Sequence, residues 1–181
     1  KPDKFIGYLT RYATARRENG GVYTHAATWA IQAYAMIKDA DNAWLAYSRL
    51  NPINSGMDPE KYVAEPFVTP GNIDGPDSPN YGMAGWTWYT GYAKWYSKVV
   101  LEWILGIRPT ENGLLVDPCI PKTWKEYKVK RTFRGTVYNI EVKNKSGVSF
   151  GVSEIFVDGI KQTVNLIRTV NKSYVEVEVI I

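Results

Sequence analysis

The stretch Ile104-Leu105-Gly106-Ile107-Arg108-Pro109 marks the point where the character of the sequence changes. Before it, apolar residues recur at helical spacing, and after it they alternate with polar residues as in β-strands. Gly106 is the kind of residue that ends a helix. The pattern predicts an α+β chain, with a helical part at residues 1–106 and a β-domain at residues 107–181.

The helical part contains three segments with apolar faces, at residues 24–37, about 42–49 and about 91–105. The first is rich in alanine, and one face carries Trp29, Ala33, Met36 and Ile37. Because the apolar faces of all three helices are wide, we expect further helices to pack against them. We interpret the chain as the C-terminal piece of a larger enzyme.

A long loop at residues 51–85 carries six prolines and little predicted secondary structure. Loops of this length are usually functional or disordered. An ordered loop is favoured by a set of apolar residues that we expect to be buried, namely Tyr62, Val63, Phe67, Val68 and Ile73.

The second part alternates apolar and polar residues from Leu114 onward. Asp158-Gly159 is a pair typical of tight hairpins, and residues 174–180 close the chain as a strand. These signals predict a small antiparallel β-sandwich.

Composition excludes several classes of protein. The 181 residues are 45% hydrophobic and 22% charged, which is typical of a folded chain. The net charge is only +4 and there is no dense Lys/Arg block, so composition alone does not argue for nucleic acid. No apolar run approaches the roughly 18 residues of a membrane span. The single cysteine, Cys119, excludes an internal disulfide framework and indicates a reducing compartment. The sequence contains neither the His/Cys spacing of a metal site nor a Gly-rich phosphate loop. Its 7 Trp and 13 Tyr indicate either a helical core or a carbohydrate-binding surface.

Two predicted helices begin with a threonine followed by a residue suited to binding an anion: Thr24-His25 and Thr90-Gly91. Helix N-termini present unpaired N–H groups and a partial positive charge, so two of them facing one cavity would bind phosphate. The alternative is that both threonines are simple N-caps and His25 has no ligand.

The loops supply further candidates. Glu18 and Glu65 lie next to structured segments, whereas Asp74 and Asp77 flank Gly75-Pro76 and are typical of turns. The aromatic residues Trp86, Trp88 and Tyr89 precede a helix in a Gly-flanked stretch, where their rings could line a sugar subsite. Trp95 and Trp103 fall on the helix stripe and are expected in the core.

Seven stretches, in the same order along the chain, resemble the inverting disaccharide phosphorylases of the cellobiose and chitobiose phosphorylase family. They are Arg17-Glu18-Asn19-Gly20-Gly21-Val22-Tyr23-Thr24-His25-Ala26, Asn51-Pro52-Ile53-Asn54, Glu65-Pro66-Phe67-Val68, Gly75-Pro76-Asp77, Trp88-Tyr89-Thr90-Gly91, Ile104-Leu105-Gly106-Ile107-Arg108-Pro109 and Asp117-Pro118-Cys119-Ile120-Pro121.

The resemblance implies the last helices of an (α/α)6 barrel followed by a small C-terminal β-domain. It implies phosphate binding by His25, Thr90 and Gly91, the residues that the helix starts also indicate. Its positions around the donor sugar match Tyr12, Arg17, Glu18 and Glu65, to which we add Trp88 as a candidate substrate contact.

The implied reaction is the reversible, inverting phosphorolysis of a β-linked glucoside to an α-sugar 1-phosphate, with inorganic phosphate as co-substrate and no cofactor or metal. The family's general acid is an aspartate far upstream of the Tyr-Thr-His motif, so we expect no catalytic residue in this segment and no activity of the segment alone. The expected partners are a β-glucoside disaccharide or oligosaccharide, phosphate and the N-terminal part of the enzyme, with neither nucleic acid nor membrane. We expect a cytoplasmic location, and association into a homodimer is left open.

One departure from the family pattern concerns specificity. Gly71-Asn72 stands where cellobiose phosphorylases have a glutamine, and Gly85-Trp86-Thr87-Trp88-Tyr89-Thr90-Gly91 resembles the members that act on β-1,2-glucans. Two alternatives to an enzyme segment are a carbohydrate-binding module that uses Trp86, Trp88 and Tyr89, and a structural domain whose sandwich packs on a neighbour.

Overall fold

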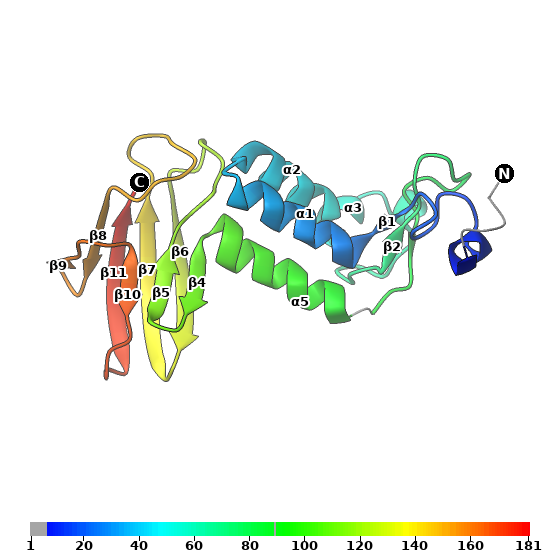
Figure 1. The fold of residues 1–181 in the computed structure, drawn as a ribbon. Coiled ribbons are helices and arrows are strands. Elements are labelled where there is room, and N and C mark those ends of the chain that lie inside the picture. The colour runs from blue at the N-terminus through cyan, green and yellow to red at the C-terminus, as the bar shows by residue number, and fades with distance from the viewer. Residues whose placement is uncertain (1–6, 89) are drawn as a thin grey trace. The chain divides into compact units, whose positions relative to one another are not determined.

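The computed structural model describes residues 7–88 and 90–181 (Figure 1). The chain forms two compact units, one made of Lys1–Ile31 with Leu45–Ser97 and the other of Gln32–Trp44 with Lys98–Ile181. It is a mixed α+β protein, as the sequence predicts.

The main helices are α1 (Thr24–Met36), α2 (Ala40–Leu50) and α5 (Thr90–Val99), close to the predicted segments. A 3-10 turn, η1 (Gly7–Arg11), precedes them. The last helix differs from the prediction because residues after Val99 form a π-helical turn, η2 (Val100–Ile104), in which the Leu105 N–H donates to the Val100 carbonyl at 2.8 Å. The 3.6-residue pattern does not reveal such a turn, because apolar spacing changes little over five residues.

The turn between α1 and α2 follows from its sequence. Lys38 adopts a left-handed conformation with φ 63°, and the N–H groups of Lys38 and Asp39 donate to the carbonyls of Ala35 and Tyr34. This pattern is the Schellman motif that ends many helices. The Asp39 carboxylate then accepts from the Asn42 N–H at 3.1 Å and caps α2.

The long loop is ordered. It contains the short helices α3 (Pro52–Ser55) and α4 (Pro59–Tyr62), each begun by a capping Asn51 or Asp58 and a proline. Its strands β2 (Asn72–Ile73) and β3 (Ala84–Gly85) join β1 (Val22–Tyr23) in an antiparallel sheet of order β1-β2-β3.

The burial expected along this loop is partly wrong. Tyr62 is only 3% exposed, but Val63 is 61% and Phe67 75% exposed. Both have positive φ, 55° and 67°. They lie in irregular backbone, where the alternation of a strand does not decide which side chain is buried.

The second unit carries two sheets. The three-stranded sheet is antiparallel with the order β10 (Leu166–Arg168), β5 (Gly113–Val116) and β4 (Ile107–Thr110). The five-stranded sheet has the order β6 (Glu126–Phe133), β7 (Thr136–Lys143), β11 (Tyr174–Ile180), β8 (Glu154–Val157) and β9 (Ile160–Lys161).

The expectation of an entirely antiparallel β-domain is wrong at one strand pair, because β7 and β11 are parallel. A long connection containing β8, β9 and β10 separates them, so the chain returns to the sheet in the same direction (Figure 1). The predicted hairpin at Asp158-Gly159 is confirmed: β8 pairs with β9, and both turn residues have positive φ.

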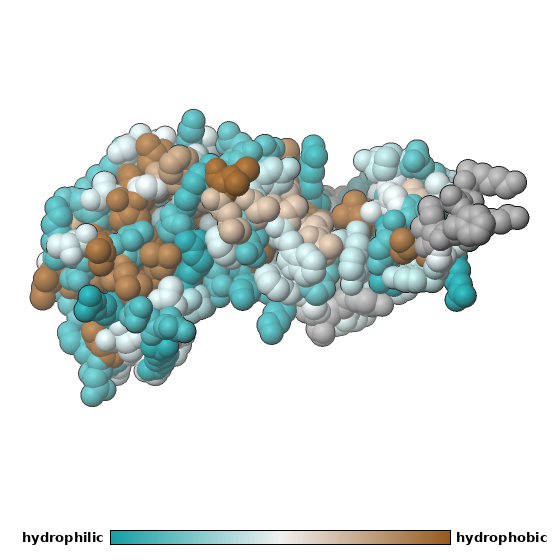
Figure 2. Space-filling model, viewed as in Figure 1, coloured by the Kyte–Doolittle hydropathy of each residue, from teal (hydrophilic) through white to brown (hydrophobic). Residues whose placement is uncertain are grey.

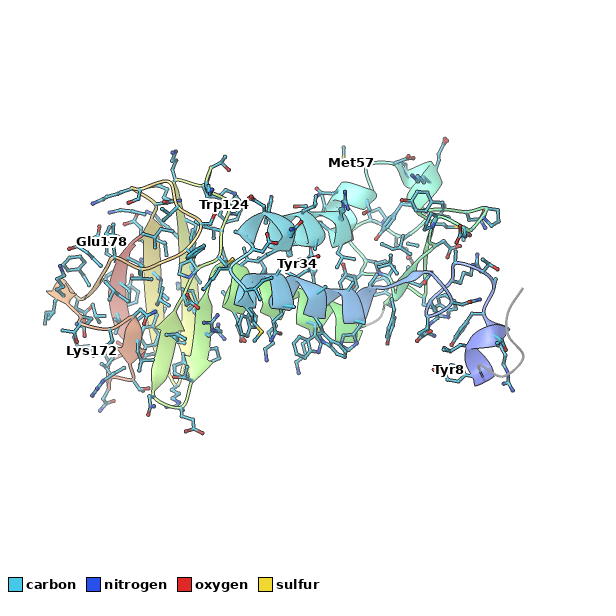
Figure 3. All side chains as sticks on the ribbon, turned by 45° about the horizontal axis from the view of Figure 1, so that its top comes forward. Tyr8, Tyr34, Met57, Trp124, Lys172 and Glu178 are labelled. Atoms are coloured by element: carbon cyan, nitrogen blue, oxygen red, sulfur yellow. The ribbon has the colours of Figure 1, made fainter. Side chains whose placement is uncertain are left out.

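In the core of this unit, buried and less buried side chains alternate along each central strand. Thr136, Tyr138, Ile140 and Val142 of β7 are buried, and so are Val175, Val177 and Val179 of β11. Trp124, seen in Figure 3, packs edge-on against Trp44 with the ring centroids 5.0 Å apart. The opposite face of the five-stranded sheet is charged, with Lys143 paired to Glu178 at 2.7 Å.

Hydrophobic side chains also reach the surface among hydrophilic ones (Figure 2). On α1, Trp29 is 52%, Met36 60% and Ile37 72% exposed, whereas Ile31 and Ala35 are buried. Throughout residues 7–88 and 90–181, none of the helices has the length and apolar character that crossing a bilayer requires.

Candidate functional site

The start of α1 is fixed by contacts with the long loop. The Thr24 N–H donates to the Gly71 carbonyl at 3.2 Å, and the Thr24 hydroxyl donates to the Pro70 carbonyl. Thr24 is completely buried, and its hydroxyl is therefore engaged outside the helix instead of capping it. Because β1 leads directly into α1, these contacts also fix the position of His25.

His25 lies among three aromatic rings at this helix start. Its ring centroid is 6.2 Å from that of Tyr23, 5.4 Å from Trp29 and 6.2 Å from Trp95. Trp95, which the sequence places in the helix core, is thus a half-buried neighbour of the histidine. The Nε2 atom of His25 is buried and has no hydrogen-bond partner among the described residues. A buried polar atom without a partner is uncommon in native proteins and indicates a missing partner.

The second predicted helix start lies beside this histidine. A β-carbon built on Gly91 would be 3.2 Å from His25 Nδ1 and 3.3 Å from Cε1, so any larger residue at position 91 would press on the ring. The structure therefore brings His25 and Gly91 together at the N-termini of α1 and α5. Thr90 is the first residue of α5, but its side chain and all of Tyr89 lie outside the described structure.

Arg17 lies in a cup of three aromatic rings. Its Cζ is 5.3 Å from the ring centroids of Tyr12 and Tyr23 and 5.2 Å from that of Trp86. Glu18 lies 3.7 Å from Arg17 Nε. The structure thus groups Tyr12, Arg17 and Glu18 with Trp86, and the assignment of the first three to a donor sugar stays a prediction. The cation–π contacts hold the planar guanidinium in a fixed orientation.

A buried polar network that the sequence did not reveal is joined to Arg17, whose N–H donates to Asn72 Oδ1 at 2.6 Å. Asp74 is 3% exposed and accepts from Arg16 Nε at 3.0 Å, Ser78 Oγ at 2.9 Å and Asn72 Nδ2 at 2.9 Å. Its interpretation as a simple turn former is therefore wrong, whereas Asp77 lies in a turn and is exposed as expected. The one available signal was the spacing of Asn72 and Asp74, which places both side chains on the same side of an extended chain.

Glu65 and Trp88 form a separate exposed pair. Trp88 Nε1 donates to Glu65 Oε1 at 3.0 Å, and the Thr87 hydroxyl donates to the same oxygen at 3.3 Å. A backbone hydrogen bond at Glu65, followed by those from Trp88 and Thr87, lowers the pKa of this carboxyl group. Such a group stays ionised near neutral pH, which does not suit a general acid. Within the described residues, the hydrogen bonds of this pair do not extend to His25 or Arg17.

The described residues offer little else for catalysis. Residues 7–88 and 90–181 contain no group of three His, Cys, Asp or Glu side chains that could hold a metal ion. What the site presents is a histidine with an unpartnered nitrogen at paired helix starts, next to an arginine in an aromatic cup. The histidine and the helix starts can bind an anion, and the arginine with its aromatic rings can bind a neighbouring ligand that carries hydroxyl groups.

The family of the chain follows from comparison with known proteins. Residues 1–106 match the family described as "Glycosyl hydrolase 94 superfamily, catalytic domain", and residues 107–164 match "Glycosyl hydrolase family 65, C-terminal domain". The chain belongs to the glycosyl hydrolase 94 superfamily, and its resemblance to the cellobiose and chitobiose phosphorylases is confirmed.

Three relatives illustrate the range of the family. The N,N'-diacetylchitobiose phosphorylase of Vibrio furnissii is 39% identical over 158 residues, which are 87% of this chain and 20% of that enzyme. The 3-O-beta-D-glucopyranosyl-beta-D-glucuronide phosphorylase of Paenibacillus borealis is 41% identical over 154 residues, 84% of this chain and 20% of that enzyme. The cyclic beta-(1,2)-glucan synthase NdvB of Rhizobium meliloti (strain 1021) is 41% identical over 143 residues, 77% of this chain and 5% of that protein. The chain thus spans a small part of the length of these relatives.

Proposed function

We propose that the chain forms the C-terminal portion of a glycoside phosphorylase and supplies its phosphate site through His25, Thr90 and Gly91. The observation that carries the proposal is the buried, unpartnered Nε2 of His25, on a ring whose Nδ1 and Cε1 atoms lie against Gly91 at the start of α5. Two helix starts offer N–H donors and partial positive charge to an anion. An imidazole N–H at Nε2 would complete the set. The names of the phosphorylase relatives support phosphate as the anion.

The proposed reaction is the reversible, inverting phosphorolysis of a β-linked glucoside to an α-sugar 1-phosphate. An inverting hydrolase needs a general acid and a general base that activates water. Inorganic phosphate is already an anionic nucleophile, so the base is unnecessary. The segment holds the phosphate oxygen in line with the anomeric carbon, and an aspartate in a preceding part of the polypeptide protonates the leaving oxygen. Its catalytic contribution is orientation.

The proposed donor-sugar contacts are Tyr12, Arg17 and Glu18, with Glu65 and Trp88 as a second group. Arginine and carboxylate side chains hydrogen-bond the sugar hydroxyls, and the exposed ring of Trp88, 72% accessible, offers a face for a sugar to stack on. We propose inorganic phosphate as the co-substrate with no further cofactor, the N-terminal part of the enzyme as the protein partner, and the cytoplasm as the location.

The test uses the full-length polypeptide and a panel of β-linked glucose disaccharides with inorganic phosphate. We expect formation of a sugar 1-phosphate, with α configuration by NMR coupling constants, and its rate should depend on phosphate concentration. Release of free sugar without phosphate incorporation would contradict the proposal. Binding of the disaccharides that is independent of phosphate, without turnover, would instead identify a carbohydrate-binding module.

A further inference from the structure

Asn72 is buried at the centre of the three-stranded sheet of the first unit. It is completely inaccessible, and in register it lies opposite Tyr23 on one side and Gly85 on the other. Its side-chain Oδ1 accepts a hydrogen bond from the Arg17 N–H at 2.6 Å, and its Nδ2 donates to Asp74 Oδ1 at 2.9 Å. A carboxylate only accepts hydrogen bonds, so Asp74 fixes which end of the amide faces Arg17.

Asp74 is itself anchored from two directions. Its Oδ2 accepts from Arg16 Nε at 3.0 Å and from Ser78 Oγ at 2.9 Å. The Asn72 amide therefore cannot rotate without breaking its bond to a buried, fully engaged carboxylate. Asn72 is consequently a rigid acceptor for the Arg17 backbone.

The backbone that Asn72 holds is in an unusual conformation. Ala15 has φ 63° and Arg17 φ 46°, in the left-handed region that L-residues rarely occupy. The turn is closed by the Ala15 N–H to the Asn19 carbonyl at 2.8 Å and the Gly21 N–H to the Arg17 carbonyl at 2.9 Å. A β-carbon at Gly21 would lie 2.6 Å from Arg17 N and 2.7 Å from Asn72 Oδ1, so only glycine leaves room for this hydrogen bond.

The conformation of Arg17 decides where its guanidinium points. The group lies 5.2–5.3 Å from the ring centroids of Tyr12, Tyr23 and Trp86. Tyr23 is the register partner of Asn72, and its ring lies 6.2 Å from that of His25. Asn72 thus fixes the Arg17 turn through its side chain and the strand that carries Tyr23 through its backbone. The Tyr23 ring lies between this region and His25 of the candidate phosphate site.

We infer that Asn72 is a positioning residue: anchored by Asp74, it holds Arg17 in the conformation that aims the guanidinium into the cup of Tyr12, Tyr23 and Trp86. The inference rests on the proposed function, in which Arg17 contacts the donor sugar. Asn72 is inaccessible and does not touch the substrate. Its effect on sugar binding is therefore transmitted through Arg17.

The test is a double-mutant cycle in the full-length enzyme with N72A, R17A and N72A/R17A, following KM for disaccharide and phosphate and the melting temperature. N72A should raise the disaccharide KM about tenfold in the wild-type background and less than about twofold in the R17A background. The phosphate KM should change less than about threefold. N72S, whose hydroxyl is too short to bridge both partners, replaces N72A if that variant does not fold.

A conservative variant separates positioning from general stability. N72D keeps the acceptor for the Arg17 N–H, and because two buried carboxyl groups in contact retain one proton between them, that proton can bridge residue 72 to Asp74 in place of the amide N–H. The variant should melt at a lower temperature than wild type, while its disaccharide KM stays within about threefold of wild type. D77N, an exposed carboxylate in the same loop, is the matched control and should change neither quantity.

The outcomes distinguish the inference from the function on which it rests. An N72A effect of equal size with and without Arg17, or an N72D KM as impaired as that of N72A, would overturn the inference alone. An R17A enzyme with unchanged disaccharide KM would overturn the placement of Arg17 at the sugar and the inference with it.

Discussion

The backbone of Gly91 lies directly against the imidazole of His25: a β-carbon at position 91 would approach Nδ1 to 3.2 Å. The contact joins the first turns of α1 and α5, which are more than sixty residues apart in sequence. The other ring nitrogen, Nε2, is buried and has no hydrogen-bond partner among the described residues. Gly91 therefore sets the position of the ring whose free nitrogen we assign to phosphate.

Gly91→Ala should impair phosphate use without destabilising the protein. The new methyl group must push the His25 ring by a few tenths of an ångström, and we expect the phosphate KM to rise about tenfold, because catalytic groups tolerate little displacement. Alanine favours a helix over glycine by about 1 kcal/mol, so the melting temperature should stay the same or rise.

The matched control for this substitution is Ala93→Gly on the exposed side of the same helix. It should cost about 1 kcal/mol of stability and leave both KM values unchanged. Equal phosphate KM values for the Gly91→Ala variant and wild type would show that the close approach has no role in binding.

The 181-residue chain by itself should not catalyse phosphorolysis. The proposed mechanism places the general acid in a preceding part of the polypeptide, and the accessible Glu65 has a pKa held below its ordinary value by its hydrogen bonds, so it is ionised at neutral pH. The measurement is sugar 1-phosphate formation by the purified chain with β-linked glucose disaccharides and phosphate. Turnover would place the proton donor within these residues.

Much of the fold could be predicted because long periodic segments are informative. The alanine-rich pattern of α1 and the aromatic stripe of α5 predict both helices to within a residue or two at their starts. The parallel pairing of β7 with β11 could not be predicted, since alternation reports which face of a strand is buried and not the direction of its neighbour. The π turn at Val100–Ile104 is hidden for a similar reason, because it alters hydrogen bonding more than apolar spacing.

The candidate site was predictable only where a local signal existed. Helix starts mark His25 and Gly91, and the structure places them in contact. The Asn72–Asp74 network has no such signal, because the burial of Asp74 depends on Arg16, 58 positions earlier in the sequence. A carboxylate in a Gly-Pro loop is usually solvated, so local reasoning gives the wrong answer for Asp74.

Two tyrosines of the second unit, the half-buried Tyr127 and the buried Tyr138, should differ in their response to loss of the hydroxyl group. The Tyr138 hydroxyl is buried without a partner among the described residues, whereas the Tyr127 hydroxyl donates to the Leu105 carbonyl at 2.7 Å. Tyr127→Phe should lower the free energy of unfolding by about 1 kcal/mol, and Tyr138→Phe should leave it unchanged or raise it. Chemical denaturation of both variants measures the difference. A larger loss for Tyr138→Phe would reveal a partner for its hydroxyl.

Asp117 should make stability depend on pH below neutrality. Burial acts to raise its pKa, but hydrogen bonds and charge from Lys38 at 2.5 Å and Arg108 at 2.6 Å outweigh it and hold the pKa below the ordinary value. Because the pKa of Asp117 is lower in the folded state than in the unfolded state, its ionised form stabilises the fold at pH values above the unfolded-state pKa. This stabilisation is lost as the pH falls through the folded-state pKa. Asp117→Asn should therefore cost about 1–3 kcal/mol at pH 7 and progressively less below about pH 4.

Melting temperatures of wild type and the Asp117 variant between pH 7 and pH 3 measure this convergence. Asp77→Asn, which removes an exposed carboxylate, should change stability by less than about 0.5 kcal/mol at neutral pH. A gap between wild type and Asp117→Asn that stays constant down to pH 3 would mean that the ion pairs do not stabilise the fold.

The central claim is that His25 serves phosphate and not the sugar, and steady-state kinetics of full-length His25→Ala, with each substrate varied in turn, test it most directly. A hydrogen bond to an ionised partner is worth roughly 1.5–3 kcal/mol, which corresponds to a loss of about tenfold to a hundredfold. We predict that this loss falls on the phosphate KM, and on kcat where the bond strengthens in the transition state, while the disaccharide KM changes less than about threefold. A variant impaired mainly in the disaccharide KM, with the phosphate KM intact, would contradict the account.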